Sequence, residues 1–138
     1  MNSSYLQSID AWVEQVPDSI KKDPLWKLEV YRDALFLFDL IWHDCEILSN
    51  HTLGKPIADQ LIRSGGSITA NMEEGFGRGY GKDYARFLRY SIGSAREARG
   101  WYYRGRRLLK PEVIQHRMQL LDKIIGSLIP ILNNQKNR

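Results

Sequence analysis

The sequence predicts an all-α protein, an up-down-up-down four-helix bundle with a short N-terminal helical extension. The first observation is that apolar residues recur three and four positions apart through four long segments, which is the spacing of one helix face. The second is that short breaks containing glycine or proline separate these segments, so consecutive helices should run antiparallel. The third is the lack of alternating apolar and polar runs, which argues against a sheet. A chain of 138 residues suffices for one such domain.

Residues 1–25 are predicted to form an N-terminal extension and linker before the bundle. Apolar residues from Leu6 to Val16 are spaced for a short amphipathic helix over residues 4–16, and Pro17 ends it. The polar stretch PDSIKKDP that follows is typical of a linker. The bundle is expected over residues 26–133, and the polar tail 134–138 is expected to be disordered.

The first long helix is expected over residues 26–49. One apolar row has alternating spacings of three and four, the heptad pattern, and consists of Leu28, Tyr31, Leu35, Phe38, Trp42 and Cys45. A second row lies beside it and consists of Ala34, Leu37, Ile41 and Leu48. An apolar surface of this width exceeds what one helix contact needs. We therefore expect a second contact surface on this helix, such as a subunit interface.

The second helix is expected over residues 56–75 and contains the stretch RSGGSITANMEEG. Gly65 and Gly66 each cost about 1 kcal/mol in a helix interior relative to alanine, so close packing must offset them. Small residues three or four positions apart, from Ser64 to Asn71, would let another backbone approach closely. Gly75 is expected to cap the helix at its C-terminus, and GFGRGYG to form the turn that follows.

The third and fourth helices are expected over residues 82–109 and 111–133. The third helix carries a small-residue patch from Ser91 to Ala95, and we expect it to meet the small residues of the second helix there. Pro111 suits the first turn of the fourth helix. Pro130 lies near its end and is expected to kink or fray the last turn.

Positive charge is concentrated on the third helix and the turn before it. Residues 1–77 carry 6 basic and 12 acidic side chains, residues 78–110 carry 10 basic and 2 acidic side chains, and the remainder is net +2. Arginine forms bidentate contacts with phosphate, so this segment predicts binding to a nucleic-acid backbone with low sequence specificity. The candidate contact residues are Arg78, Lys82, Arg86, Arg89, Arg96, Arg99, Arg104 and Arg107.

Two interpretations of this basic segment stay open. In the first, Tyr80, Trp101, Tyr102 and Tyr103 offer stacking surfaces for unpaired bases beside the arginines. In the second, the arginines form a solvated face, or pair with acidic residues of the first long helix, namely Asp33, Asp39, Asp44 or Glu46. The basic face would then serve an assembly scaffold that binds an acidic protein partner.

Other kinds of site find little support in the sequence. Cys45 is the single cysteine and is expected in the core, and no Cys/His spacing predicts a metal site. GFGRGYG lacks the lysine and Ser/Thr of a phosphate-binding loop. No E-x-x-H motif occurs, so we expect no enzyme activity, metal or cofactor. The absence of a signal sequence and of a long apolar run predicts a cytoplasmic protein without a membrane partner.

The stretch QLIRSGGSITANMEEGFGRGYGKDYARFLRYSIGSAREAR resembles the signature of a known family. This family comprises the proteins of intervening sequences in 23S ribosomal RNA genes, also called the S23 ribosomal protein family. The matching positions are Gln60, Leu61, Arg63, Ser64, Ser67, Ile68, Asn71, Glu74, Gly75, Phe87, Leu88, Ser91, Gly93, Ser94 and Glu97. The sequence is also similar to the accessory proteins of diversity-generating retroelements.

The resemblance implies a left-handed up-down bundle that assembles as a homo-oligomer, typically a pentamer. It further implies nucleic acid, RNA or DNA, and a reverse transcriptase as partners. We expect seven motif residues to have a structural role, namely Arg63, Asn71, Glu74, Gly75, Gly93, Ser94 and Glu97. In this interpretation Glu74 and Glu97 accept hydrogen bonds inside the small-residue contact, from Asn71, Ser94 or Arg63, because a buried carboxylate needs such partners.

Overall fold

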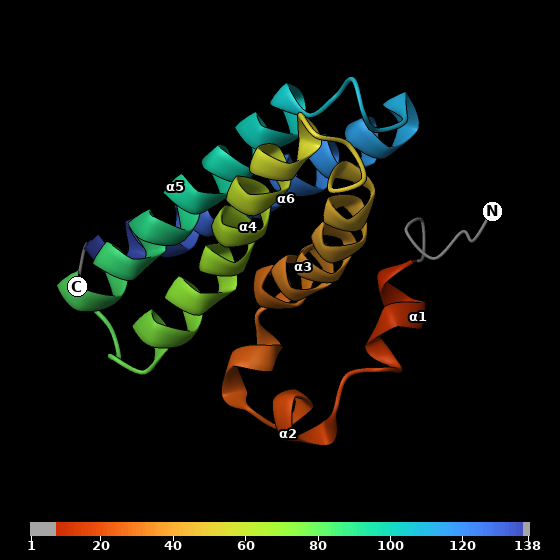
Figure 1. Cartoon of the computed structure of the whole chain (residues 1–138). Coiled ribbons are helices and arrows are strands. Elements are labelled where there is room, and N and C mark those ends of the chain that lie inside the picture. The colour runs from red at the N-terminus through yellow and green to blue at the C-terminus, as the bar shows by residue number, and fades with distance from the viewer. Residues whose placement is uncertain (1–7, 137–138) are drawn as a thin grey trace.

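The computed structural model describes residues 8–136 and confirms an all-α bundle (Figure 1). The four long helices of the bundle are α3 (Glu29–Leu48), α4 (Gly54–Phe76), α5 (Lys82–Arg104) and α6 (Pro111–Lys136). Three short elements precede them, namely α1 (Ile9–Val13), α2 (Asp18–Lys21) and the 3-10 helix η2 (Pro24–Lys27). The predicted helix over residues 4–16 is therefore shorter among the described residues, and its positions 4–7 lie outside them.

The long helices run antiparallel to their neighbours in chain order. The Tyr31 hydroxyl at the start of α3 donates to Glu73 near the end of α4, at 2.7 Å. The Gly81 amide, just before α5, donates to Gln135 in the last turn of α6, at 3.1 Å. Helix α3 also contacts α6, which closes the ring of four. These contacts give the predicted up-down-up-down order, whereas the left-handed twist stays a prediction.

The pairing of α4 with α5 is the most extensive in the bundle. Small residues make it possible: the Ser91 hydroxyl donates to the backbone carbonyl of Ile68 across the pair, at 2.9 Å. A Cβ atom added at Gly75 would lie only 2.6 Å from the Cβ of Phe87. The prediction that these two helices pack together is confirmed, and Ser91 lies in their contact, but the two small-residue patches do not face each other as a whole.

The two adjacent glycines of α4 have a different role from the one expected. A Cβ at Gly65 would lie 2.4 Å from Cδ1 of Ile41, and one at Gly66 would lie 3.3 Å from the ring of Phe38. Both of these neighbours belong to α3. Gly65 and Gly66 therefore accommodate the large side chains of α3, whereas the contact with α5 uses Ser91 and Gly75.

The prediction that Gly75 caps α4 is wrong. The helix continues to Phe76, and Gly77 is its C-terminal cap with an ordinary φ of −68°. Gly75 is buried inside the last turn, where no side chain would fit against α5. The turn to α5 depends on Gly79 and Gly81, whose φ angles of 88° and 85° favour glycine.

The last two helices end at different residues from those predicted. Helix α5 stops at Arg104, not at residue 109. Gly105 is its C-terminal cap and packs closely against Leu48 and Ile57, and the chain turns there. Helix α6 continues for six residues past Pro130, so the predicted fraying does not occur. Its helical span includes residues 134–136, which were expected to be disordered, while residues 137–138 lie outside the described chain.

The two apolar rows of α3 differ in exposure. Ala34, Leu37, Ile41 and Leu48 are fully buried in the main core. In the heptad row, Tyr31 and Cys45 are buried in the same core, whereas Trp42 is 59% exposed. The heptad row is therefore buried only in part.

The N-terminal extension covers another face of α3, beside the two apolar rows. The Trp12 indole donates to Asp39 at 2.7 Å, and its ring packs against Phe36 and Trp26. The segment predicted as a linker, residues 17–24, includes the turn of α2 and the start of η2. Part of the wide apolar surface of α3 is therefore covered by the chain itself and needs no partner subunit.

Candidate nucleic-acid interface

Helix α5 separates its apolar and basic residues onto opposite sides. The buried side includes Tyr84, Leu88, Ser91, Ala95, Ala98 and Tyr102, which face α4 and α6. The opposite side is exposed and carries Lys82, Arg86, Arg89, Arg96 and Arg104, called here the basic stripe. Gly93 lies on the same side, where an added Cβ would meet nothing within 4 Å. The candidate contacts are thus brought together along one straight, rigid element.

The cations of the basic stripe differ in how strongly the chain itself engages them. Arg86 lies 3.6 Å from Asp83 and 5.1 Å from the centre of the Phe87 ring. Arg104 lies 4.6 Å from the centre of the Trp101 ring. Within residues 8–136, Lys82, Arg89 and Arg96 have no ion pair or hydrogen bond. The middle of the stripe is therefore free to contact a ligand.

Three further predicted contacts lie outside the stripe. Arg78 is in the turn before α5, where it is bound to Glu74 at 2.9 Å and lies 5.2 Å from the Phe87 ring. Arg107 is exposed in the turn after α5. Arg99 is at the side of the helix and is bound to Asp122 of α6 at 2.7 Å. Arg78 and Arg107 extend the stripe at its two ends, and Arg99 does not belong to it.

The predicted pairing of these arginines with acidic residues of α3 does not occur. Asp33 pairs with Lys123 of α6, at 3.1 Å, and Asp39 accepts the hydrogen bond from Trp12. Asp44 pairs with Arg117 of α6. Since α5 lies across the bundle from α3, its outer face is too far from these carboxylates. The positive charge of the stripe consequently stays at the surface.

The aromatic residues near the stripe offer fewer stacking surfaces than predicted. Tyr102 is fully buried, where its hydroxyl donates to Asp44, and burial raises its pKa well above the ordinary value. The Trp101 ring lies under Arg104, and the Tyr103 ring lies 4.0 Å from the guanidinium of Arg106. Tyr80 is exposed in the turn before α5. Tyr90, which the sequence argument did not single out, is also exposed beside the stripe.

Most of the predicted structural motif lies at the surface instead of in the helix contact. Glu74 and Glu97 are exposed, and their described partners are Arg78 and Trp101, each four residues further along the chain. The expectation that they are buried and accept hydrogen bonds from Asn71, Ser94 or Arg63 is wrong. Both carboxylates lie on an exposed face of their helix. The sequence pattern alone did not distinguish this exposed position from a buried one.

The other motif residues divide in the same way. Arg63 pairs with Asp59 one turn earlier, at 3.4 Å, and the Asn71 amide donates to the Ser67 carbonyl. Gly93 is exposed, and Ser94 is partly buried. Gly75 alone among the seven packs tightly against another helix. Arg63 and Glu74 on α4 and Gly93 and Glu97 on α5 are therefore exposed motif positions, which close packing within one chain does not explain.

A buried ion pair holds α3, α5 and α6 together. Arg117 Nε lies 2.7 Å from Asp44 Oδ2 and Arg117 Nη2 lies 3.1 Å from Asp44 Oδ1, with both side chains fully buried. The Tyr102 hydroxyl donates to the same carboxylate at 2.6 Å. Sequence reasoning missed this network. The signal was present, because Asp44 and Arg117 are charges of opposite sign at positions where the helical pattern requires buried residues.

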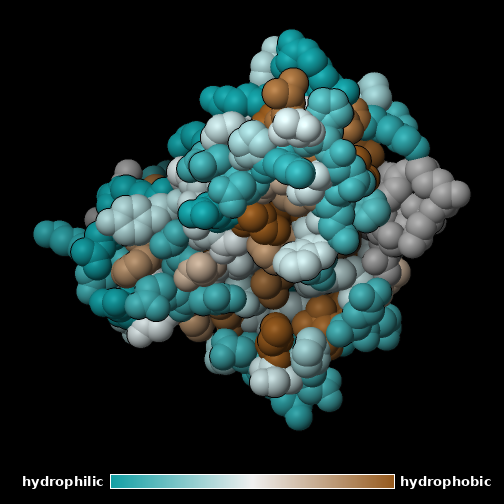
Figure 2. Space-filling view, viewed as in Figure 1, coloured by the Kyte–Doolittle hydropathy of each residue, from teal (hydrophilic) through white to brown (hydrophobic). Residues whose placement is uncertain are grey.

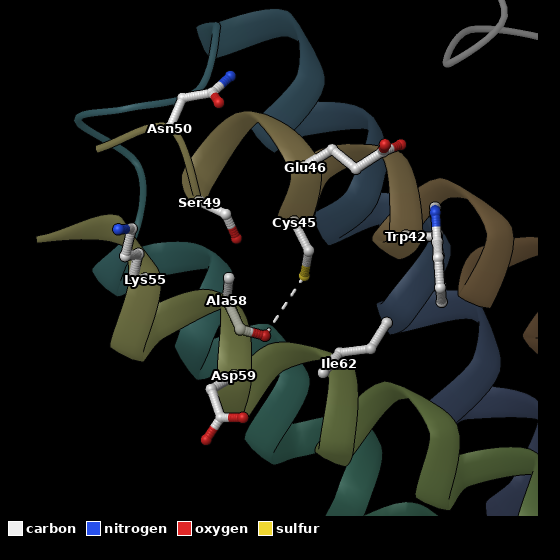
Figure 3. A pocket seen from close by; sticks show the side chains of 9 residues that line it. All are labelled: Trp42, Cys45, Glu46, Ser49, Asn50, Lys55, Ala58, Asp59 and Ile62. Atoms are coloured by element: carbon white, nitrogen blue, oxygen red, sulfur yellow. Dashed lines mark hydrogen bonds between the residues drawn. The ribbon is translucent and has the colours of Figure 1, made fainter. Parts of the chain in front are cut away.

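A groove lies between the last turns of α3 and the first turns of α4 (Figure 3). It has a volume of about 680 Å³ and is lined by Trp42, Cys45, Glu46, Ser49, Asn50, Lys55, Ala58, Asp59 and Ile62. The Cys45 thiol donates to the Ala58 carbonyl at 3.4 Å, and burial raises its pKa to about 12. The thiol is therefore protonated at neutral pH and is not a nucleophile.

Figure 2 shows that hydrophobic residues reach the surface at the centre of the face drawn there.

The described residues contain no metal cluster and no helix that could span a membrane. Between residues 8 and 136, no three His, Cys, Asp or Glu side chains are grouped so that they could hold a metal ion. None of the described helices is both long and apolar enough to cross a membrane.

The fold and the stripe together define a class, an all-α bundle of four long helices whose third helix is arginine-rich on its outer face. The model of the 23S rRNA-intervening sequence protein family matches residues 26–130. The chain belongs to this family. The match begins inside η2, so it leaves out α1 and α2.

One solved structure shows the same fold. It is the crystal structure of a protein of unknown function from the S23 ribosomal protein family of Bacteroides thetaiotaomicron, with 24% sequence identity and a TM-score of 0.70. The superposition covers 75% of this chain and 97% of that chain. Among curated proteins, no sequence matches this chain. Family membership and fold are thus shown, and the biochemical role has to be argued from the surface.

Proposed function

We propose that the protein is a non-enzymatic nucleic-acid-binding protein that contacts the phosphate backbone through the basic stripe of α5. The single observation that carries this proposal is that the side chains of Arg89 and Arg96 are exposed and, within residues 8–136, unpaired. Both are exposed at the centre of the stripe, and neither has an ion pair or hydrogen bond with any residue of the described chain. A run of unpaired arginines on a rigid helix is costly in self-repulsion and is suited to a polyanion.

The arrangement favours phosphate over base recognition. The stripe is the outer face of a helix, and none of its residues lines the groove between α3 and α4. Base-specific readout requires side chains that reach base edges in a groove of the nucleic acid. Guanidinium groups form bidentate bonds with phosphate oxygens irrespective of sequence. We therefore expect affinity that depends strongly on salt and weakly on base sequence.

The proposal is tested by charge reversal at the centre of the stripe. The double variant Arg89→Glu/Arg96→Glu should lower affinity for a labelled oligonucleotide by at least about tenfold at moderate salt, measured by fluorescence anisotropy. Lys22→Glu/Lys55→Glu makes the same change of net charge at two exposed positions away from α5 and is the matched control. Circular dichroism should show an unchanged helix content in both.

Equal affinities of the two double variants would contradict the proposal, because the interaction would then follow net charge and not the stripe. An acidic protein that binds the stripe while oligonucleotides do not would establish the alternative role of an assembly scaffold.

We also propose that copies of the chain associate through the exposed motif surface of α4 and α5. Its support is that Glu74 and Glu97 match the family motif and are exposed, and that their described partners, Arg78 and Trp101, lie on or just beyond their own helices. A homo-oligomer, such as the pentamer that the resemblance implies, would repeat the stripe and raise avidity. Light scattering on the wild type and on Glu97→Arg tests this: a smaller mass for the variant is expected, and a monomeric wild type would overturn it.

A further inference from the structure

We infer that the basic stripe takes double-stranded nucleic acid in preference to single strands, and that it binds the duplex through its phosphates alone. This inference rests on the proposed function and narrows its ligand. It rests on three features of α5: several of its rings are buried or covered by arginines, two of its arginines are held in place, and the stripe is straight and long.

The first feature is the condition of the aromatic rings. Proteins that bind single strands combine a basic surface with open rings on which bases stack. Here Tyr102 is fully buried, and Trp101 lies under Arg104. Tyr103 is 57% exposed, and the guanidinium of Arg106 lies 4.0 Å from its ring centre. Phe87 has two guanidinium groups, of Arg78 and Arg86, at 5.2 and 5.1 Å from its centre. A base could stack directly on these faces only by displacing an arginine.

The second feature is that the chain holds two stripe arginines in place. Arg86 is held by Asp83 and the Phe87 ring. Arg104 lies across the helix at Gly100, where an added Cβ would come within 2.9 Å of its Nη1 atom. Side chains that are already ordered lose less conformational freedom on binding. Such an arrangement suits a ligand whose phosphates are also fixed, as they are in a duplex but not in a flexible single strand.

The third feature is the length and shape of the stripe. Lys82 and Arg104 are 22 residues apart on one continuous helix, a distance of about 33 Å at 1.5 Å per residue. One turn of duplex DNA is about 34 Å long. At the midpoint of the stripe, Gly93 has only open space where a side chain would be, so a rigid backbone can approach the helix closely. A straight cationic edge of this length matches one turn of a duplex.

The test compares one duplex with its own strands. A mixed-sequence DNA duplex of about 20 base pairs, two helical turns, and each strand alone would compete for the full-length protein at equal phosphate concentration. We expect the duplex to compete at least about tenfold more effectively than either strand. The variant Tyr80→Ala/Tyr90→Ala/Tyr103→Ala removes the three exposed rings on and beside α5 and should change the affinity for the duplex less than about twofold.

The outcomes separate this inference from the proposed function. Single strands that bind as well as the duplex, with binding that still depends on Arg89 and Arg96, would overturn the duplex preference and leave phosphate binding in place. A large loss of affinity in the tyrosine variant would overturn it as well, because bases would then be stacking. Binding of neither form at low salt would overturn the proposed function together with this inference.

Discussion

At the scale of single residues, the most consequential interaction is the buried pair of Asp44 and Arg117. Both side chains are inaccessible to solvent, and the Tyr102 hydroxyl completes the coordination of the carboxylate. Burying two charges is costly, so such a pair adds little net stability compared with apolar residues of similar volume. Its integrity is nonetheless essential, because removing one partner leaves the other charge buried without compensation.

Replacement of Asp44 by alanine should therefore be severely destabilising. We expect the free energy of unfolding to fall by about 3–5 kcal/mol, because Arg117 would lose its counter-charge in the core. Urea denaturation measures it. The matched control is Asp122→Ala, which removes the carboxylate of the exposed pair with Arg99 and should cost less than about 1 kcal/mol. Similar losses for the two variants would show that the Asp44 pair is not buried as described.

His116 links this network to pH. Its Nδ1 atom lies 2.8 Å from Arg117 Nη1, and since arginine only donates, neutral His116 accepts at Nδ1. Burial and the Arg117 charge, partly opposed by Asp44, lower the pKa of His116 below 6.5. The unfolded chain therefore takes up this proton first as the pH falls. Stability should be fully retained above pH 6.5 and should decline as the pH falls toward the folded pKa.

The measurement is the unfolding free energy between pH 7.5 and pH 5.5, taken as approximate limits around the ordinary histidine pKa. His116→Gln should flatten the decline, whereas His51→Gln, at an exposed position in the turn before α4, should leave it unchanged. A decline that is equally steep in all three proteins would mean that other groups cause it.

At the scale of helices, glycines that look alike in the sequence have opposite environments. Gly65 and Gly75 are buried against Ile41 and Phe87, respectively. Gly93 and Gly126 have no neighbour within 4 Å of an added Cβ. The first pair makes close packing possible, and the second pair is not explained by packing within one chain.

This contrast predicts opposite effects of alanine. Gly93→Ala should stabilise the monomer by about 0.5–1 kcal/mol, because alanine favours the helix and meets no obstacle. Gly75→Ala should destabilise it by about 1–3 kcal/mol, because the new methyl group would collide with Phe87 and force α5 away from α4. Thermal denaturation distinguishes them. If Gly93→Ala is destabilising, then another chain packs against that face, which would contradict a stripe that is open at its centre.

The helices themselves could largely be predicted from the sequence, because apolar spacing directly reflects the period of a helix. Their ends and neighbours could not. Helix α5 ends before Gly105, which packs against Leu48 and Ile57, residues distant in the sequence. Gly65 likewise packs against Ile41 of α3. Spacing also did not show that Trp42 is exposed while Tyr31 and Cys45, in the same apolar row of α3, are buried.

At the scale of the whole molecule, the candidate site was predictable to the extent that it depends on charge and helical period. Lys82, Arg86, Arg89, Arg96 and Arg104 lie on one exposed face, as their spacing requires. What the sequence did not show depends on distances between elements. Asp122 of α6 forms an ion pair with Arg99, and the buried Asp44 accepts a hydrogen bond from the buried Tyr102 hydroxyl. For the same reason Glu74 and Glu97 were expected to be buried and are not.

The uneven charge also determines how the whole molecule should meet a polyanion. The segment up to Gly77 is net −6, and residues 78–110 are net +8. The resulting field orients the α5 side toward a negative ligand, and salt screens that attraction within about 10 Å at 0.1 M.

The most direct test of the central claim is the salt dependence of duplex DNA binding, on protein whose mass in solution has been fixed by light scattering. If the five cations of the stripe contact phosphates, the logarithm of the association constant should fall with the logarithm of salt concentration with a slope of about −4 to −5 for each bound subunit. A slope near zero, or no binding at low salt by an intact protein, would contradict the account.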